Sequence, residues 1–86
     1  MKMQITLEAA RVLMGYSLRE AAEKFGVHYQ TLSSWEKNPN KMKGEYIEKI
    51  PEIYGVEKNA IFFGTQNEFI RYLRNENEKN KLNNIM

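Results

Sequence analysis

Basic side chains gather in the middle of this chain, and they suit binding to a negatively charged partner. Residues 24–43 hold four lysines, His28 and a single glutamate, whereas residues 44–57 hold four glutamates and one lysine. The whole chain has 13 basic and 11 acidic residues, so its net charge of +2 says little by itself. A positive segment of this kind attracts polyanions. Charge alone is equally compatible with a chance cluster on a solvated surface.

Side chains that perform catalysis are scarce. The chain has no cysteine, no aspartate and one histidine, so no Ser/His/Asp or Cys/His set can be assembled. It also lacks a glycine-rich phosphate loop. Glu20 and Glu23 lie three residues apart, which is typical of a solvated helix face when no other catalytic group accompanies the carboxylates. We therefore expect no enzymatic activity, no metal site, no cofactor and no small-molecule ligand.

Two short helices joined by a glycine are predicted to present the basic segment. Ser17 and Glu20 have the spacing of a capping box, which begins the first helix. Gly26 ends that helix, because glycine adopts a positive φ at little cost. Its apolar face consists of four residues at helical spacing, namely Leu18, Ala21, Ala22 and Phe25.

The second helix is predicted over residues 28–37, with Leu32 and Trp35 facing inward. Two helices that cross steeply over a glycine-containing turn form a helix-turn-helix unit, whose second helix can enter the major groove of DNA. Trp35 could instead stack on bases, as aromatic residues do in single-strand binders. It follows Leu32 by three residues on the inward face, so we expect it in the core.

An amphipathic helix is predicted before this unit. Thr6 is its expected N-cap, Glu8 favours its first turn, and Gly15 ends it. Its core face is marked by Leu7, Ala10 and Met14.

Shorter helices are predicted after the unit. Residues 38–44 form a loop. A helix over residues 46–54 should be kinked or split at Pro51, since proline lacks a backbone donor. A short apolar helix over residues 59–63 ends at Gly64. The expected fold is therefore all-α, a compact bundle of about five short helices with the helix-turn-helix at helices two and three.

The composition changes after Gly64. Residues 65–86 hold six asparagines. From Asn75 onward the polar excess favours a frayed tail. We expect a helix-turn-helix domain over residues 1–64 and a C-terminal extension over residues 65–86. Two helical turns of this extension are predicted from its apolar residues Phe69, Ile70, Tyr72 and Leu73.

Length and hydropathy limit the class of protein further. Eighty-six residues suffice for one domain. No apolar run approaches the roughly 20 residues that span a bilayer, and the first ten residues contain no stretch typical of a signal peptide. We expect a cytoplasmic protein without a membrane partner.

Short sequence motifs at particular spacings extend over residues 5–64: Ala10-Arg11, Gly15-Tyr16-Ser17, residues 20–27, Thr31-Leu32-Ser33, Trp35-Glu36, residues 54–56 and residues 61–63. In this combination the chain resembles the Cro/CI-type (XRE-like) family of helix-turn-helix phage repressors, whose DNA-binding domain is lambda-repressor-like. It is most similar to small regulators encoded by phages and mobile elements of Gram-positive bacteria.

The resemblance implies which residues read DNA bases. The family's base-reading positions correspond here to Tyr29, Gln30, Ser33 and Ser34. Gln30 can pair with adenine N6 and N7, Ser34 can reach donor or acceptor edges, and Tyr29 can lie against a thymine methyl. Each good bidentate pair discriminates between bases by about 1–3 kcal/mol. The competing interpretation is a merely solvated helix face.

The resemblance also implies contacts to phosphate, with two departures from the family pattern. His28 stands where the family has Ser or Thr as a helix cap, and histidine is expected to cap poorly. Leu18 stands where the family commonly has a phosphate-binding glutamine, which leucine cannot replace. The residues expected to meet the DNA backbone are Arg19, His28, Thr31, Lys37, Asn38, Lys41 and Lys43.

Arg11 and Glu36 match family positions that often form an ion pair between the first and third helices. We expect this pair to be structural. One helix-turn-helix reads only a few base pairs, so a homodimer, at least on DNA, and a pseudo-palindromic operator are expected as well.

These observations favour a sequence-specific regulator of transcription that binds double-stranded DNA. The alternative is a helix-turn-helix module used mainly for protein contact, as in an anti-repressor or antitoxin-like protein. Two features keep it open. Leu18 and His28 weaken the expected pattern of DNA anchoring, and Val12 and Leu13 put apolar groups on a face that relatives leave polar. The C-terminal extension either folds back over them, which we prefer, or leaves them to another chain.

Overall fold

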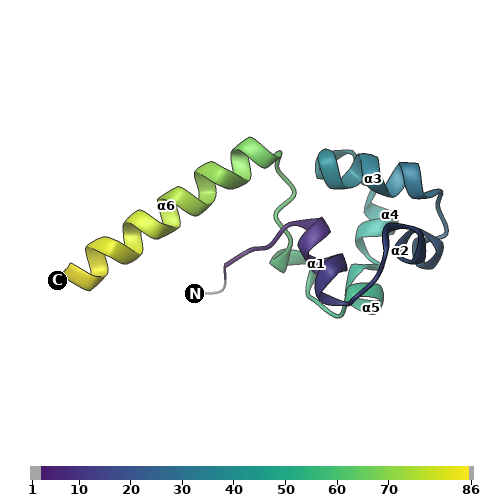
Figure 1. Cartoon of the computed structure of the whole chain (residues 1–86), viewed down its shortest axis with the longest axis horizontal. Coiled ribbons are helices and arrows are strands. Elements are labelled where there is room, and N and C mark those ends of the chain that lie inside the picture. The colour runs from purple at the N-terminus through teal and green to yellow at the C-terminus, as the bar shows by residue number, and fades with distance from the viewer. Residues whose placement is uncertain (1–2, 86) are drawn as a thin grey trace.

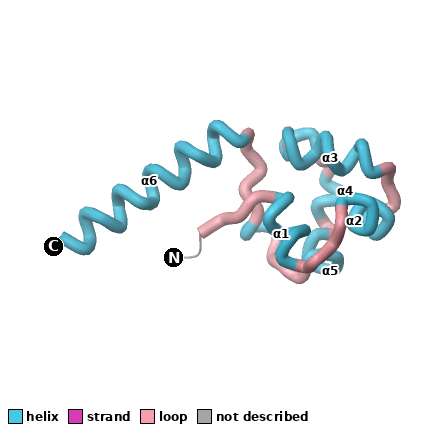
Figure 2. Tube along the Cα trace, in the orientation of Figure 1, coloured by secondary structure: helices cyan, strands magenta, loops and turns pink. Residues whose placement is uncertain are grey.

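The structure is a computed structural model that describes residues 3–85. Within that range the chain is helical throughout, apart from loops and one isolated bridge between Ile5 and Ile61 (Figures 1 and 2). The all-α prediction is confirmed. In chain order the elements are α1 (Leu7–Leu13), α2 (Leu18–Phe25), α3 (Tyr29–Lys37), the 3-10 turn η1 (Pro39–Lys41), α4 (Gly44–Ile47), α5 (Ile50–Tyr54), the 3-10 turn η2 (Lys58–Ala60) and α6 (Gln66–Ile85).

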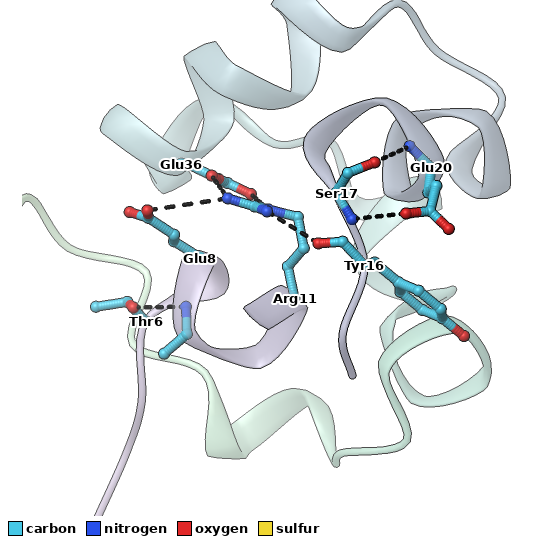
Figure 3. Close-up of polar contacts among 8 residues, drawn as sticks. Thr6, Glu8, Arg11, Tyr16, Ser17, Glu20 and Glu36 are labelled. Atoms are coloured by element: carbon cyan, nitrogen blue, oxygen red, sulfur yellow. Dashed lines mark hydrogen bonds and ion pairs between the residues drawn. The ribbon is translucent and has the colours of Figure 1, made fainter. Parts of the chain in front are cut away.

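The helix-turn-helix forms where its sequence signals lie. The Ser17 hydroxyl accepts a hydrogen bond from the Glu20 backbone N–H at 3.1 Å, and the Glu20 carboxylate accepts one from the Ser17 backbone N–H at 3.0 Å (Figure 3). These hydrogen bonds lower the pKa of Glu20. Gly26 ends α2 with a φ of 75°. The predicted capping box and turn are therefore confirmed.

One core holds α1, α2, α3 and α5 together. The Phe25 ring meets Trp35 edge-on at 6.2 Å between ring centroids, and it meets Tyr54 edge-on at 5.4 Å. The fully buried side chains include Leu7, Ala10, Ala21, Ala22, Leu32 and Ile50. Trp35 is 6% exposed, which confirms its place in the core. Met14 was expected there too, but it is 43% exposed because α1 ends before it.

The segment after η1 is divided, as predicted. Helix α4 ends at Ile47 and α5 begins at Ile50, so the break precedes Pro51. Pro51 lies in the first turn of α5, where its missing N–H has no intrahelical partner to lose.

The expected short helix over residues 59–63 is wrong beyond Ala60. The Ile5 backbone N–H donates to the Ala60 carbonyl at 2.9 Å, and the Phe62 backbone N–H donates to the Ile5 carbonyl at 2.8 Å. This parallel bridge holds Ile61 extended and 1% exposed. Sequence periodicity does not reveal this bridge, because its two residues, Ile5 and Ile61, lie at opposite ends of the domain's sequence.

The predicted two-turn helix and frayed tail are also corrected. Helix α6 runs for 20 residues and begins with a second capping box. The Thr65 backbone N–H donates to the Glu68 carboxylate at 3.0 Å, and the Thr65 hydroxyl accepts from the Glu68 backbone N–H at 3.3 Å. It points away from the bundle (Figure 1), and the molecule measures 49 × 22 × 22 Å. It does not fold back over Val12 and Leu13, which are 59% and 75% exposed. Side chains are described only to residue 79.

Helix α6 is attached through its first two turns. Phe62 packs against Phe69 and Tyr72, with ring centroids 5.2 and 5.3 Å apart. The Tyr72 hydroxyl accepts a hydrogen bond from the Gln4 backbone N–H at 2.9 Å. A Cβ on Gly64 would lie 2.5 Å from the Phe62 ring, so glycine is required for this aromatic contact.

Arg11 and Glu36 join α1 to the end of α3 (Figure 3). Arg11 Nε donates to Glu36 Oε2 at 2.7 Å, and Nη2 donates to Oε1 at 3.2 Å. Arg11 Nη1 also donates to the Tyr16 carbonyl at 3.0 Å, and Glu8 lies 3.8 Å away. The two paired side chains are only 13% and 8% exposed. Hydrogen bonding to Glu36 raises the pKa of Arg11 above its already high value.

We expect Arg11→Ala to destabilise the domain by about 3–5 kcal/mol, because it strands the Glu36 carboxylate in the interior. The matched control is Lys58→Ala. It breaks a pair of the same 2.7 Å length to Glu48, but those side chains are 47% and 67% exposed, so about 1 kcal/mol or less is expected. Urea titrations measure both. Equal small losses would show that the Arg11 pair adds no more than a surface contact.

Gly64→Ala should displace Phe62 and loosen the attachment of α6, at a cost of about 1–3 kcal/mol for overpacking. Gly44→Ala is the control, because a Cβ there meets nothing within 4 Å and the backbone is unstrained. Amide hydrogen exchange reports the result. Protection of the first turns of α6 should fall in the Gly64 variant alone, and unchanged protection would contradict the proposed role of the glycine.

The stability of the domain should depend on pH through Tyr54. Its hydroxyl is buried without a hydrogen-bond partner among the described residues. Burial raises the pKa of Tyr54, and the Glu36 charge raises it further. Stability should therefore hold below the unfolded tyrosine pKa of about 10 and decline as pH rises above it. Tyr54→Phe should be no less stable than the wild type at pH 7 and should lose part of that decline in urea titrations. An identical decline in both proteins would exclude Tyr54 as its source.

Candidate nucleic-acid interface

Helix α3 turns one side to the core and the other to solvent. Leu32 and Trp35 are buried beneath it, and Figure 1 shows the helix along the outer edge of the bundle. Its outer side borders a shallow open groove. The groove is lined by Leu18, Tyr29, Gln30, Ser33, Ser34, Lys37, Asn38, Lys41 and Thr65. The structure thus brings all four predicted base-reading residues together.

The polar groups of this groove are available to a ligand. Gln30 and Ser34 are exposed, and Ser33 is half-buried. Within the part of the chain that the structure describes, the Gln30 amide and the two serine hydroxyls form no side-chain hydrogen bonds. Each can both donate and accept. Lys37 and Lys41 add positive charge, and the lining contains no acidic residue.

His28 caps α3, contrary to the expectation from its residue type. Its Nδ1 accepts a hydrogen bond from the Gln30 backbone N–H at 3.1 Å, as a serine hydroxyl would. His28 itself is exposed.

The residues expected to meet phosphate are divided between two places. Lys37, Asn38 and Lys41 line the groove near the end of α3. Arg19 and His28 lie beside Tyr29 at its start, with the Arg19 guanidinium 4.1 Å and the His28 ring 4.4 Å from the Tyr29 ring centroid. The structure does not bring Thr31 and Lys43 into the groove, although both are exposed.

Two lining residues were not assigned to the site from the sequence. Leu18 supplies an apolar wall where the family commonly has glutamine. Thr65 brings the start of α6 to the groove, and its signal was the Thr65-x-x-Glu68 capping box, which places a helix start at that point.

Neither a metal-binding cluster nor a membrane-spanning helix is found in residues 3–85. No group of three His, Asp or Glu side chains there is arranged to hold a metal ion. No helix in that range is long and apolar enough to cross a bilayer.

Comparison with known proteins gives the family. No match is found among curated proteins or among solved structures. A helix-turn-helix family profile matches residues 7–61, which is the span from the first residue of α1 to the bridge at Ile61. That family is one of DNA-binding regulators of the XRE type. With well over half of its length matched, this chain belongs to the helix-turn-helix family.

Proposed function

We propose that this protein is a sequence-specific regulator of transcription that inserts α3 into the major groove of double-stranded DNA. The groove on the outer side of α3 is the observation that supports this best, because it combines free amide and hydroxyl groups with lysines and contains no acidic side chain. Gln30 pairs with adenine, and Ser33 and Ser34 contact neighbouring base edges.

The backbone contacts come from both ends of the helix. Lys37, Asn38 and Lys41 reach phosphates at its end, and Arg19 and His28 do so at its start. Two exposed residues outside the groove, Thr31 in the first turn of α3 and Lys43 after η1, add further contacts. Contacts of this kind fix register and make affinity dependent on salt. Leu18 supplies none of them, so the start of the helix relies on Arg19 and His28.

The biological setting is part of the proposal. A small cytoplasmic protein of the phage or mobile-element type, similar to Cro-like repressors, would act without a cofactor or small-molecule effector. A single α3 reads too few base pairs for useful specificity, so two copies bind half-sites about one helical turn apart in a pseudo-palindromic operator.

A second candidate function is contact with another protein, as in an anti-repressor. The exposed apolar side chains at the end of α1 favour it, namely Val12, Leu13 and Met14, which are 59%, 75% and 43% exposed. Three adjacent apolar residues so exposed are typical of a contact surface. This surface does not include the residues that line the groove beside α3.

Selection from a random duplex library at about 150 mM salt, near physiological ionic strength, tests the proposal. We expect enrichment of a two-fold symmetric site, and Gln30→Ala should relax the preference at one base pair per half-site. Salt-sensitive binding without enrichment, equal for both proteins, would contradict sequence-specific reading and favour the protein-contact function.

Lys41→Ala should behave differently from Gln30→Ala on the selected site. It should weaken binding to all sequences alike and reduce the slope of log K against log salt by about 0.9, the value for one phosphate contact. Lys58→Ala is the control, since Lys58 lies in η2 outside the groove and pairs with Glu48. Titrations between low and high salt measure the slope. An unchanged slope for Lys41→Ala would place that lysine outside the interface.

A further inference from the structure

The Tyr29 ring lies close to two neighbouring side chains, Arg19 and His28. The Arg19 guanidinium carbon lies 4.1 Å from the ring centroid, and the His28 ring centroid lies 4.4 Å away at 31°. Tyr29 is also partly buried against the core. The ring therefore already contacts two neighbouring side chains and the core, in addition to bordering the groove where the family resemblance implies a thymine methyl.

Arg19 in α2 and Arg11 in α1 differ in their hydrogen-bond partners. Arg11 donates to Glu36 and to the Tyr16 carbonyl. Among the residues that the structure describes, none accepts a hydrogen bond from Arg19 and no carboxylate pairs with it. Its planar fork of five donors therefore lies over the tyrosine ring without an acceptor among the described residues.

The position of Arg19 suits a phosphate. It is the second residue of α2, the helix that crosses the DNA backbone in a helix-turn-helix complex. Stacking on Tyr29 places its guanidinium at the start of α3, of which Tyr29 is the first residue. Its neighbour Leu18 has no group for phosphate. A guanidinium binds phosphate through two parallel hydrogen bonds, and prior immobilisation reduces the entropy lost when it does so.

We propose that Arg19 is the principal phosphate anchor at the start of α3 and that Tyr29 is its positioning residue, not a reader of bases. The Tyr29 ring holds the guanidinium toward the DNA backbone, and the cation–π contact replaces the hydrogen bonding by which a glutamine at position 18 would anchor the helix. This inference rests on the proposed binding of α3 in the major groove.

A double-mutant cycle on the selected duplex tests the proposal. Arg19→Ala should weaken binding about tenfold at near-physiological salt, as expected for one lost charged hydrogen-bonding contact, and should reduce the salt slope by about 0.9. Tyr29→Leu, which keeps an apolar side chain but removes the ring face, should weaken binding in the same direction. The double variant should bind no worse than Arg19→Ala alone, because the ring acts through the guanidinium. Tyr29→Phe should bind like the wild type and keep its base preferences.

The chain provides a matched control in Lys24, a second cation of α2 that lies over an aromatic ring, 4.9 Å from the Tyr16 centroid. Lys24 lies in the last turn of α2 and over Tyr16, not over a residue of α3, so Lys24→Ala should leave the salt slope unchanged. Circular dichroism of each variant establishes that it is folded before its binding is compared.

The outcomes separate this inference from the proposed function. Additive losses in the cycle would overturn the coupling of Tyr29 to Arg19, and relaxed preference at one base pair in Tyr29→Leu, which removes the ring, would show that Tyr29 reads a base. Either result leaves DNA binding by α3 intact. Failure of the wild-type protein to prefer any duplex would overturn the proposed function and this inference together.

Discussion

Burial of Leu32 and Trp35 is the constraint on which the rest of the structure depends. These residues lie three apart, so their burial fixes the rotation of α3 about its axis and turns Gln30, Ser34 and Lys37 to solvent. Phe25 and Tyr54 supply the other side of this packing through edge-on aromatic contacts. The apolar core thus selects which polar side chains form the candidate interface.

The Arg11–Glu36 pair complements this constraint. Rotation of α3 is set by its buried face, while its placement relative to α1 is set by two hydrogen bonds that the Arg11 guanidinium donates to the Glu36 carboxylate. The pair is nearly buried, and a buried pair contributes through the penalty for breaking it more than through its own attraction. The domain consequently uses one arginine to position its helices and leaves another, Arg19, unpaired at the surface that we assign to DNA.

Local signals in the sequence predicted the helix-turn-helix well. The capping box at Ser17, the turn at Gly26 and the inward positions of α3 depend on neighbours within a few residues, and all of them are confirmed. Two features set by distant partners were not predicted. The bridge from Ile5 to Ile61 and the packing of Phe62 on Phe69 and Tyr72 join segments whose relation no periodicity reveals.

In the candidate site, too, local signals were predictive and contacts between distant segments were not. Its members on α3 followed from helical spacing and the family resemblance, whereas Leu18 and Thr65 enter the groove through the packing of α2 and α6. The cap formed by His28 depends on a side-chain rotation that residue type alone does not specify. Roles in DNA reading, the division into residues 1–64 and 65–86, and dimerisation stay predictions.

NMR titration of the labelled protein with the selected duplex, at near-physiological salt, tests the central claim most directly. If α3 enters the major groove, the side-chain amide of Gln30 and the backbone amides of Ser33 and Ser34 should shift and broaden, while Val12 and Leu13 stay unperturbed. Perturbation confined to the end of α1, with the α3 signals unchanged, would contradict the account and assign the molecule's contacts to its apolar surface.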